Sequence, residues 1–485
     1  MNLKEIFDSI SRQECFGYAP ASSSTKPAHI ANGWLRRLVG KTYDPVLLND
    51  TAIHWQGSSE VNPSEPLLEG NKSVFDPFLA GSRREEFVQF RANLRGLISP
   101  YGGAVNRGNN RSSYNITCQE HLTKDFSDNS VGAFLYHLVR TDCGSGPSLI
   151  SDLLVRLLQE RSDELAIVTL PLTQDAVENV VSLPTYPASK VFRRVRSSFS
   201  SAVLQSLRVG FDQLGAFEAK NGDVADTLRR AVVFGVFAVM LHMVNRGREL
   251  EKKPGLTPML LYFQGKRRTT VQMGSHQTYT LCRQVIEHLY VRQFRLKITD
   301  RLGEQPNVRD CQKLIKDIQS SSPAETKKQQ EEALNLFNAY RTTSRPIDAL
   351  ASSLTDVAFR LQKGNPTDFY RGLGVRVGML RPSSGTRKHF TLDGALLEAV
   401  LASVVGDSPL SYQGLLDLLY DRYGLLTGGR PADANILLDE GIDQVTVADL
   451  RENSKALRHA LGAMGWARAY ADGVVSIQVP DGECS

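Results

Sequence analysis

Two carboxylates and a lysine, Asp212, Glu218 and Lys220, come nearest in this sequence to the residues of a metal-dependent nuclease. Such an enzyme uses clustered carboxylates to hold Mg²⁺ and a lysine to assist the attacking water. The six-residue gap between the carboxylates is shorter than the strand–turn–strand on which such residues usually lie, and the segment has a helical pattern. A divergent metal-dependent nuclease is therefore an alternative reading, and catalysis is not the favoured one.

A zinc site is a second candidate, formed by Cys118, His121, His137 and Cys143. Two thiolates and two imidazoles are enough for tetrahedral zinc. The second pair does not have the spacing of a zinc knuckle, and buried thiols with ordinary histidines are the favoured interpretation. The sequence therefore predicts no metal and no cofactor.

Motifs for nucleotide hydrolysis and for a serine nucleophile are missing from the sequence. It contains neither a GxxxxGK[ST] loop nor a Gly-x-Ser-x-Gly elbow. Gly265-Lys266 follows Tyr-Phe-Gln instead of a glycine-rich loop, and Cys143-Gly-Ser-Gly146 lacks the lysine. These absences favour a protein that does not itself carry out a reaction.

Nucleic-acid contact has better support, because three basic patches are interleaved with aromatic residues. They are Phe192-Arg-Arg-Val-Arg196, Phe263-Gln-Gly-Lys-Arg-Arg268 and Tyr290-Val-Arg-Gln-Phe-Arg-Leu-Lys297. Arg and Lys neutralise phosphates, while an exposed aromatic ring can stack on an unpaired base. The alternative is that Phe192, Phe263 and Phe294 are core residues and only the cations are exposed. This alternative is favoured for Phe294, which lies on an apolar helical stripe.

The distribution of charge agrees with this interpretation. The net charge is only +5, but residues 190–301 hold 20 basic and eight acidic residues, a local charge of +12. Arginine supplies 39 of the 57 basic residues, and its planar, bidentate cation suits phosphate. The alternatives are an acidic partner protein, bound by a scaffold, or a solvated helical face.

Length and composition indicate a globular protein of several domains. The chain has 485 residues, of which 41% are hydrophobic and 22% charged. Six scattered cysteines and an N-terminus unlike a signal peptide suggest the reducing cytoplasm. The longest apolar run, Ala231–Val244, has 14 residues, which is too short for a membrane span and predicts a buried core helix.

The hydrophobic pattern predicts a mainly α-helical chain in three segments: a mixed α+β region over 1–118, a helical domain over 119–365 that includes the basic patch 190–301, and a final segment over 366–485. Helices of the middle segment are expected over Val131–Thr141, Ser148–Arg161, Ser189–Leu207, Val224–Leu250, Thr278–Phe294 and from Ser322 to Tyr340. Glu164–Leu170 has the pattern of a strand.

The last segment begins with an expected basic hairpin formed by Val375–Met379 and Lys388–Leu392. Three helices should follow, from Asp393 to Val405, after Ser411, and from Thr446 or Asp449 to Met464, with a loop over 424–445. A closing hairpin is expected from Trp466–Tyr470 and Val474–Val479, joined by Asp472-Gly473.

Three helices and a two-stranded hairpin are the element order of a winged-helix domain, which residues 393–480 resemble. The resemblance implies that the third helix is the recognition helix, which in DNA-binding members enters the major groove. Its exposed side chains are then expected to be Arg451, Asn453, Ser454, Lys455 and Arg458. Residues 366–485 carry 11 basic and 15 acidic residues, however, and many winged helices instead mediate protein assembly.

The sequence thus predicts a non-catalytic subunit that binds nucleic acid, DNA in particular, mostly through the backbone. Because motor and nuclease motifs are missing, partner subunits of a bacterial DNA-processing or anti-phage defence assembly are expected to supply the chemistry. The residues expected to contact nucleic acid are Arg193, Arg194, Arg196, Lys266, Arg267, Arg268, Arg292, Arg295, Lys297, Arg376, Arg387, Lys388, Arg451, Lys455 and Arg458.

Overall fold

The computed structural model describes residues 1–20, 25–42, 119–123, 125, 127–140, 147–160, 181–182, 201–250, 252–265, 269–361, 365–406, 408–471 and 474–480. Within these residues the protein is mainly helical, as the sequence predicts. Contacts divide the chain into two compact units: unit 1 is Met1–Thr25, Ser189–Leu207 and Phe237–Ser485, and unit 2 is Lys26–Ala188 and Arg208–Val236.

Unit 2 packs its helices around aromatic side chains. Its elements include α2 (Pro27–Val39), β1 (Lys41–Thr42), η2 (Gln119–His121), α7 (Val131–Arg140), α8 (Leu149–Glu160) and β2 (Val181–Ser182). The Trp34 ring meets Phe211 at 5.7 Å between centroids, and Phe211 meets Phe234 edge-on at 4.9 Å. Such edge-to-face contacts add to the energy of burial, so these rings fix the packing of α2.

Two long helices, α12 (Ala202–Asn221) and α13 (Val224–Leu250), contribute residues to both units. Among the described helices, only the part Asp226–Leu250 is long and apolar enough to cross a membrane, and 83% of its most apolar window is buried in the protein. Burial of this kind is typical of a core helix. It is also what the run Ala231–Val244 predicts.

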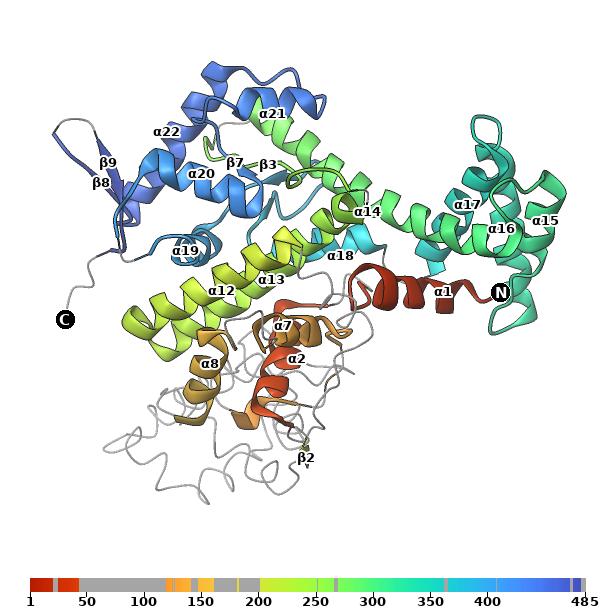
Figure 1. The fold of residues 1–485 in the computed structure, drawn as a ribbon, viewed down its shortest axis with the longest axis horizontal. Coiled ribbons are helices and arrows are strands. Elements are labelled where there is room, and N and C mark those ends of the chain that lie inside the picture. The colour runs from red at the N-terminus through yellow and green to blue at the C-terminus, as the bar shows by residue number, and fades with distance from the viewer. Residues whose placement is uncertain are drawn as a thin grey trace, which may run out of the picture. The chain divides into compact units, whose positions relative to one another are not determined.

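Helix α14 (Thr270–Leu302) is the central helix of unit 1. It packs on α17 (Pro346–Leu361), α18 (Pro366–Arg376) and β3 (Met259–Leu260), and Figure 1 shows it running from the strands to the α15–α17 group. Its buried stripe recurs every three to four residues. The ring of Tyr290 on this stripe stacks on Phe7 of α1 (Leu3–Ser9), with centroids 5.0 Å apart.

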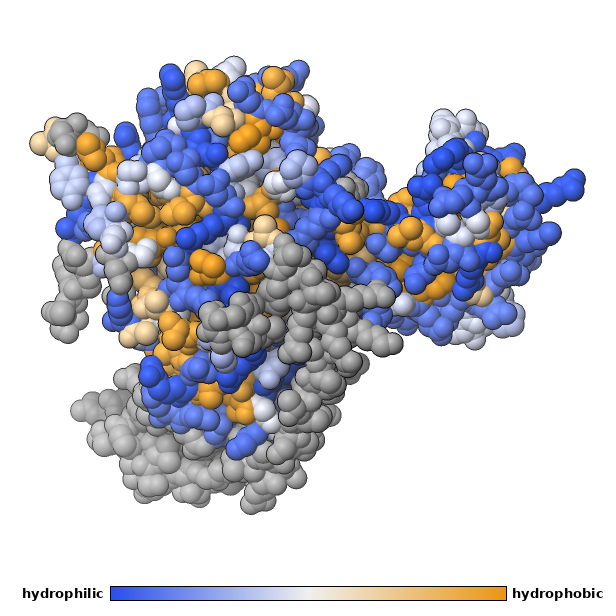
Figure 2. All heavy atoms as spheres, in the orientation of Figure 1, coloured by the Kyte–Doolittle hydropathy of each residue, from blue (hydrophilic) through white to orange (hydrophobic). Residues whose placement is uncertain are grey.

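Helices α15 (Val308–Lys316) and α16 (Pro323–Tyr340) cover α17 at one end of α14. Ser322 caps α16, because its Oγ accepts a hydrogen bond from the Glu325 backbone N–H at 3.2 Å. The predicted start and end of this helix are confirmed. The outer surface of the group is largely hydrophilic in Figure 2, as expected for helices with one buried face.

Short strands form four small sheets in the described chain. β3 pairs in parallel with β7 (Leu425–Leu426), and β4 (Leu380–Arg381) pairs antiparallel with β5 (His389–Phe390). The third sheet has the order β6-β9-β8, from β6 (Leu410–Ser411), β9 (Val475–Ile477) and β8 (Ala467–Ala469). The fourth pairs β1 with β2.

The last helices of unit 1 are α19 (Gly394–Ala402), α20 (Tyr412–Tyr423), α21 (Asp433–Asp439) and α22 (Val447–Ala463). Asp393, Ser411 and Thr446 cap α19, α20 and α22 with side-chain oxygens. These three starts are confirmed, since each cap residue precedes an apolar helical pattern. The pairing of β8 with β9 confirms the closing hairpin.

Three element predictions are wrong in detail. The first strand of the hairpin is β4 at 380–381 instead of the five-residue alternation Val375–Met379, because the helix capped by Asn365 continues to Arg376. Residues 424–445 contain β7 and α21 instead of a plain loop. The helix expected over Thr278–Phe294 is longer at both ends, since Thr269 caps α14.

Several expected elements lie outside the described residues. They are the strand over Glu164–Leu170, most of the Ser189–Leu207 helix, the Asp472-Gly473 turn, and all of 43–118. Of the Ser189–Leu207 helix, the described part belongs to α12, where Val203 and Leu207 are buried.

Candidate nucleic-acid interface

One face of α22 presents three cations to solvent. Arg451, Lys455 and Arg458 are exposed, and their spacing of four and three residues places them on one side of the helix. Leu457 and Leu461 lie on the opposite, buried side. The amphipathic pattern of the helix therefore sets which side chains can reach a ligand.

A groove of about 590 Å³ lies between α22 and the hairpin of β8 and β9. It is lined by Lys455, Arg458, His459, Gly462, Ala463, Ala467, Ala469 and Val475. None of these residues carries a carboxylate, although Glu452 outside the lining pairs with Lys455 at 2.7 Å. The small side chains leave room beside the helix. His459 is a residue that the sequence analysis missed, although it follows Lys455 by one helical turn.

Asn453 is buried, which corrects the expectation that it is exposed. Its Nδ2 donates to the carbonyl oxygens of Leu261 and Thr427, each at 2.8 Å, and its Oδ1 accepts from the Phe263 N–H at 2.9 Å. A buried amide that makes all these bonds joins α22 to the ends of β3 and β7. Asn453 therefore positions the helix and cannot read a base edge.

Ser454 is also buried instead of exposed. The Tyr412 hydroxyl donates to the Ser454 carbonyl oxygen at 2.6 Å, and burial raises the pKa of Tyr412 to about 12. Two adjacent polar residues thus belong to the packed side of α22. Asn453 and Ser454 are buried because they lie next to Leu450 and Leu457, on a buried stripe that is wide enough to include them.

Many acidic residues of 366–485 form ion pairs or cap helices, and none of these lines the groove. Pairs join Asp368 to Arg371, Asp393 to Arg381, Asp417 and Asp433 to Arg430, Glu440 to Arg248, and Glu452 to Lys455. The Asp449 carboxylate accepts from Thr446, which lowers its pKa. Of these carboxylates, that of Glu452 is the one whose partner, Lys455, lines the groove.

Arg430 organises the largest of these acidic groups. Its guanidinium carbon lies 4.1 Å from the centroid of the Tyr420 ring, and its Nε lies 3.1 Å from Asp417. Asp433 is fully buried beside it, and burial raises the pKa of that carboxyl to about 6, an effect that Arg430 partly offsets. Gly428 lies beside this cluster, because its backbone bonds to Asp433. Gly428 and Gly429 closely approach Leu450 and Ser454 and so support α22.

The predicted contact residues fall into three groups. Arg193, Arg194, Arg196, Lys266, Arg267 and Arg268 lie outside the described residues. Arg292, Arg387, Arg451 and Arg458 are exposed and make no ion pair within the described chain. The others are engaged by the protein: Arg295 pairs with Asp348 and Glu304, Lys297 with Glu14, and Lys455 with Glu452, while Arg376 donates to the Thr25 carbonyl oxygen.

Lys388 is buried and acts inside the first hairpin. Its Nζ donates to the carbonyl oxygens of Pro382 and Ser383, so it closes the turn instead of facing solvent. The aromatic residues of the α14 patch are also internal, because Tyr290 and Phe294 are fully buried. Burial of Phe294 agrees with the core interpretation of that residue, and Phe263 is half-buried.

Asp212 and Glu218 both lie on α12, and each pairs with a different arginine. Glu218 is buried and its two carboxylate oxygens lie 2.6 and 2.9 Å from the Arg230 guanidinium, while Asp212 pairs with Arg208 at 3.2 Å. No group of three His, Cys, Asp or Glu side chains within the described residues could hold a metal ion. Cys118 and Cys143 of the zinc candidate lie outside those residues.

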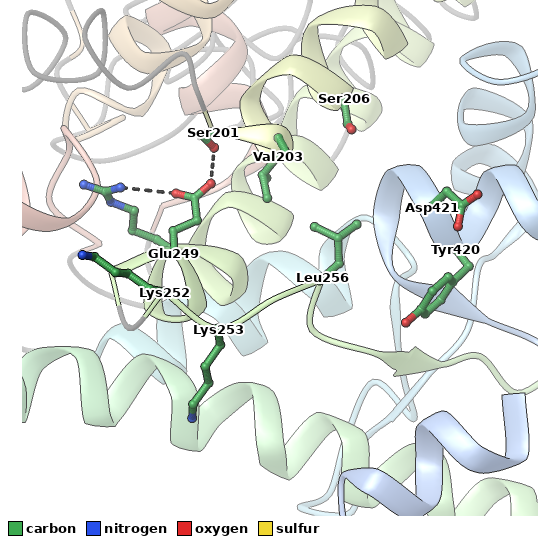
Figure 3. Close-up of a pocket in the computed structure, with 12 residues that line it drawn as sticks. Ser201, Val203, Ser206, Glu249, Lys252, Lys253, Leu256, Tyr420 and Asp421 are labelled. Atoms are coloured by element: carbon green, nitrogen blue, oxygen red, sulfur yellow. Dashed lines mark hydrogen bonds and ion pairs between the residues drawn. The ribbon is translucent and has the colours of Figure 1, made fainter. Parts of the chain in front are cut away.

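A second cavity, of about 570 Å³, lies where α12 begins, α13 ends and α20 passes (Figure 3). Its walls include Val203, Leu256 and Tyr420, with Lys252 and Lys253 at its edge. Inside it, Glu249 accepts from Ser201 and pairs with Arg246 at 3.2 Å.

Comparisons with models of protein families, with curated proteins and with solved structures found no match to this chain.

Proposed function

We propose that this chain binds nucleic acid, DNA in particular, without catalysis, as a cytoplasmic subunit of a bacterial DNA-processing or anti-phage defence assembly. The observation that carries the proposal is the groove beside α22, which is lined by cations and by no carboxylate. Partner subunits supply the chemistry. Most of the binding energy comes from phosphate contacts, because the cations of α22 neutralise phosphates and release counterions.

The order of elements in the last segment supports a winged-helix domain. Helices α19, α20 and α22 precede the β8–β9 hairpin, and the sheet order β6-β9-β8 joins the hairpin to the segment before α20. Helix α22 has 17 residues, so it is about 25 Å long, and the major groove of about 12 Å admits a helix. The inserted α21 departs from the plain order of three helices. Contacts to base edges would be made by Arg451 and Arg458, since Asn453 is buried.

The test is fluorescence anisotropy of a labelled duplex of about 30 base pairs at about 50 and 200 mM salt. The variant is Arg451→Ala/Lys455→Ala/Arg458→Ala. The control is Lys313→Ala/Lys327→Ala/Lys328→Ala, which removes the same charge from exposed lysines of α15 and α16. Both sets are solvent-exposed, so each leaves the unfolding temperature close to the wild-type value.

The two triple variants should differ in the salt dependence of binding. If each cation of α22 contacts one phosphate, the slope of log affinity against log salt falls by about 2.7 in the α22 variant. The control retains the wild-type slope. Equal losses in both variants would show that only net charge matters, and an absence of binding at low salt would favour the scaffold with an acidic protein partner.

A further inference from the structure

The cavity of Figure 3 has the size and the mixed walls of a small-ligand site, and it lies apart from the groove of α22. Small-ligand sites range from about 300 to 1,000 Å³ and combine apolar walls with a few placed polar groups. Leu256 lies between Val203 of α12 and Tyr420 of α20 in Figure 3. These three side chains form an apolar wall for a flat or compact group.

Opposite charges lie at the two ends of this cavity. Lys252 and Lys253 follow the end of α13 and are exposed at the edge of the cavity, and Figure 3 shows their side chains pointing away from Leu256. Asp421 lies on the α20 side, beside Tyr420. The other lining carboxylate, Glu249, is already engaged by Ser201 and Arg246. A ligand that fits both ends must carry an anion at one end and a hydrogen-bond donor at the other.

Lys252 has a backbone conformation that favours glycine. Its φ is 55°, and its N–H donates to the Glu249 carbonyl oxygen while the Lys253 N–H donates to that of Arg248. This is the hydrogen-bond pattern of a Schellman motif, in which the left-handed residue is usually Gly. A lysine here costs about 1 kcal/mol in backbone strain, and it brings an ammonium group to the mouth of the cavity. Lys252 makes no ion pair with any described residue.

We propose that this cavity binds a nucleoside phosphate whose base carries an amino group. The phosphate meets Lys252 and Lys253 at the mouth, the base packs on Leu256, and its exocyclic amine donates to the Asp421 carboxylate, as amines of bases do with acidic side chains. The same chemistry is present in a free nucleotide and in the terminal nucleotide of a strand. The inference goes beyond DNA binding by α22 and does not depend on it.

The test is isothermal titration of the full chain with AMP, UMP and inorganic phosphate, and with a single strand of about 12 adenosines. AMP should bind at least about fivefold more tightly than UMP, which lacks the amine, and more tightly than phosphate. Asp421→Ala should abolish the preference for AMP over UMP, because it removes the acceptor of the base amine. Binding of the strand alone, lost in the Lys252 variant below, would assign the site to a strand terminus.

The variant Lys252→Gly tests the role of the Lys252 ammonium group without destabilising the fold. It removes the ammonium group and relieves the left-handed strain, so the unfolding temperature stays or rises while AMP affinity falls about tenfold. Lys327→Ala, an exposed lysine of α16, is the control and retains affinity. The Arg451→Ala/Lys455→Ala/Arg458→Ala variant should also retain AMP binding, so failure of the DNA proposal leaves this test intact. No binding of AMP or of the strand, or full affinity in Lys252→Gly, would overturn the proposal.

Discussion

The Nδ2 of Asn453 on α22 lies 2.8 Å from the carbonyl oxygen of Leu261, a residue 192 positions earlier in the chain. The same side chain binds the Phe263 N–H and the Thr427 carbonyl oxygen. Phe263 is therefore tied to α22, and Gln264 adds a bond to the Asp449 carbonyl oxygen at 3.2 Å. The residues that follow β3 and helix α22, far apart in the sequence, thus share one anchor.

Asn453→Ala should lower the free energy of unfolding of unit 1 by about 3 kcal/mol. The substitution leaves the buried carbonyl groups of Leu261 and Thr427 and the half-buried N–H of Phe263 without their partner, and each buried group costs about 1 to 3 kcal/mol. Urea unfolding followed by tryptophan fluorescence measures the change. Glu452→Ala, one position earlier and exposed, should change stability by less than about 0.5 kcal/mol. Similar effects of both variants would contradict the anchor.

Local sequence patterns predict α16 and three helices of the last segment well. Asp393, Ser411, Ser322 and Thr446 each precede a helical pattern and each caps its helix in the structure. A cap and an amphipathic repeat act within one or two turns, so they can be recognised without knowledge of the fold.

Features that depend on distant contacts were not predictable in the same way. The two-residue parallel pair of β3 with β7 joins Met259 to Leu425, and no local pattern marks strands of that length. Asn453 was expected on the exposed face because its type is polar, whereas backbone groups far away in the sequence determine its burial. Polar residues that satisfy buried backbone groups cannot be told from surface residues by sequence alone.

Gly428→Ala should be far more destabilising than Gly441→Ala, although both glycines have positive φ, at 83° and 78°. A Cβ at 428 would lie 2.2 Å from the Leu450 carbonyl oxygen on α22, whereas nothing lies within 4 Å of one at 441. The shared backbone strain costs about 1 kcal/mol, and the steric clash raises the cost at 428 to about 3 kcal/mol. Thermal unfolding measures both variants, and equal shifts would show that α22 does not press on this loop.

Asp433 should make the stability of unit 1 depend on pH. Burial raises its pKa from 3.8 to about 6, so the folded state holds the proton more strongly than the unfolded state does. Its contribution is therefore complete below about pH 4 and is lost as the pH rises through 6.

The variant Asp433→Asn removes this titration. Relative to wild type, the stability of the variant should rise by about 3 kcal/mol between pH 4 and pH 7, which follows from a shift of about two pKa units. Unfolding midpoints at intervals across this range measure the difference. Asp421→Asn, on the exposed residue of α20, should show no such trend. A constant difference between Asp433→Asn and wild type would contradict the raised pKa.

Glu218→Gln should destabilise unit 2 by about 3 kcal/mol, because it removes the buried carboxylate that binds the Arg230 guanidinium and leaves only the more distant and more exposed Asp226, at 3.6 Å. Glu160→Gln is the control, since its pair with Arg156 is solvent-exposed and contributes little. A nuclease would behave differently: Glu218→Gln would keep its stability and lose Mg²⁺-dependent cutting of plasmid. Because both carboxylate oxygens of Glu218 are already bound to Arg230, we expect the loss of stability, and wild-type protein should leave the plasmid intact.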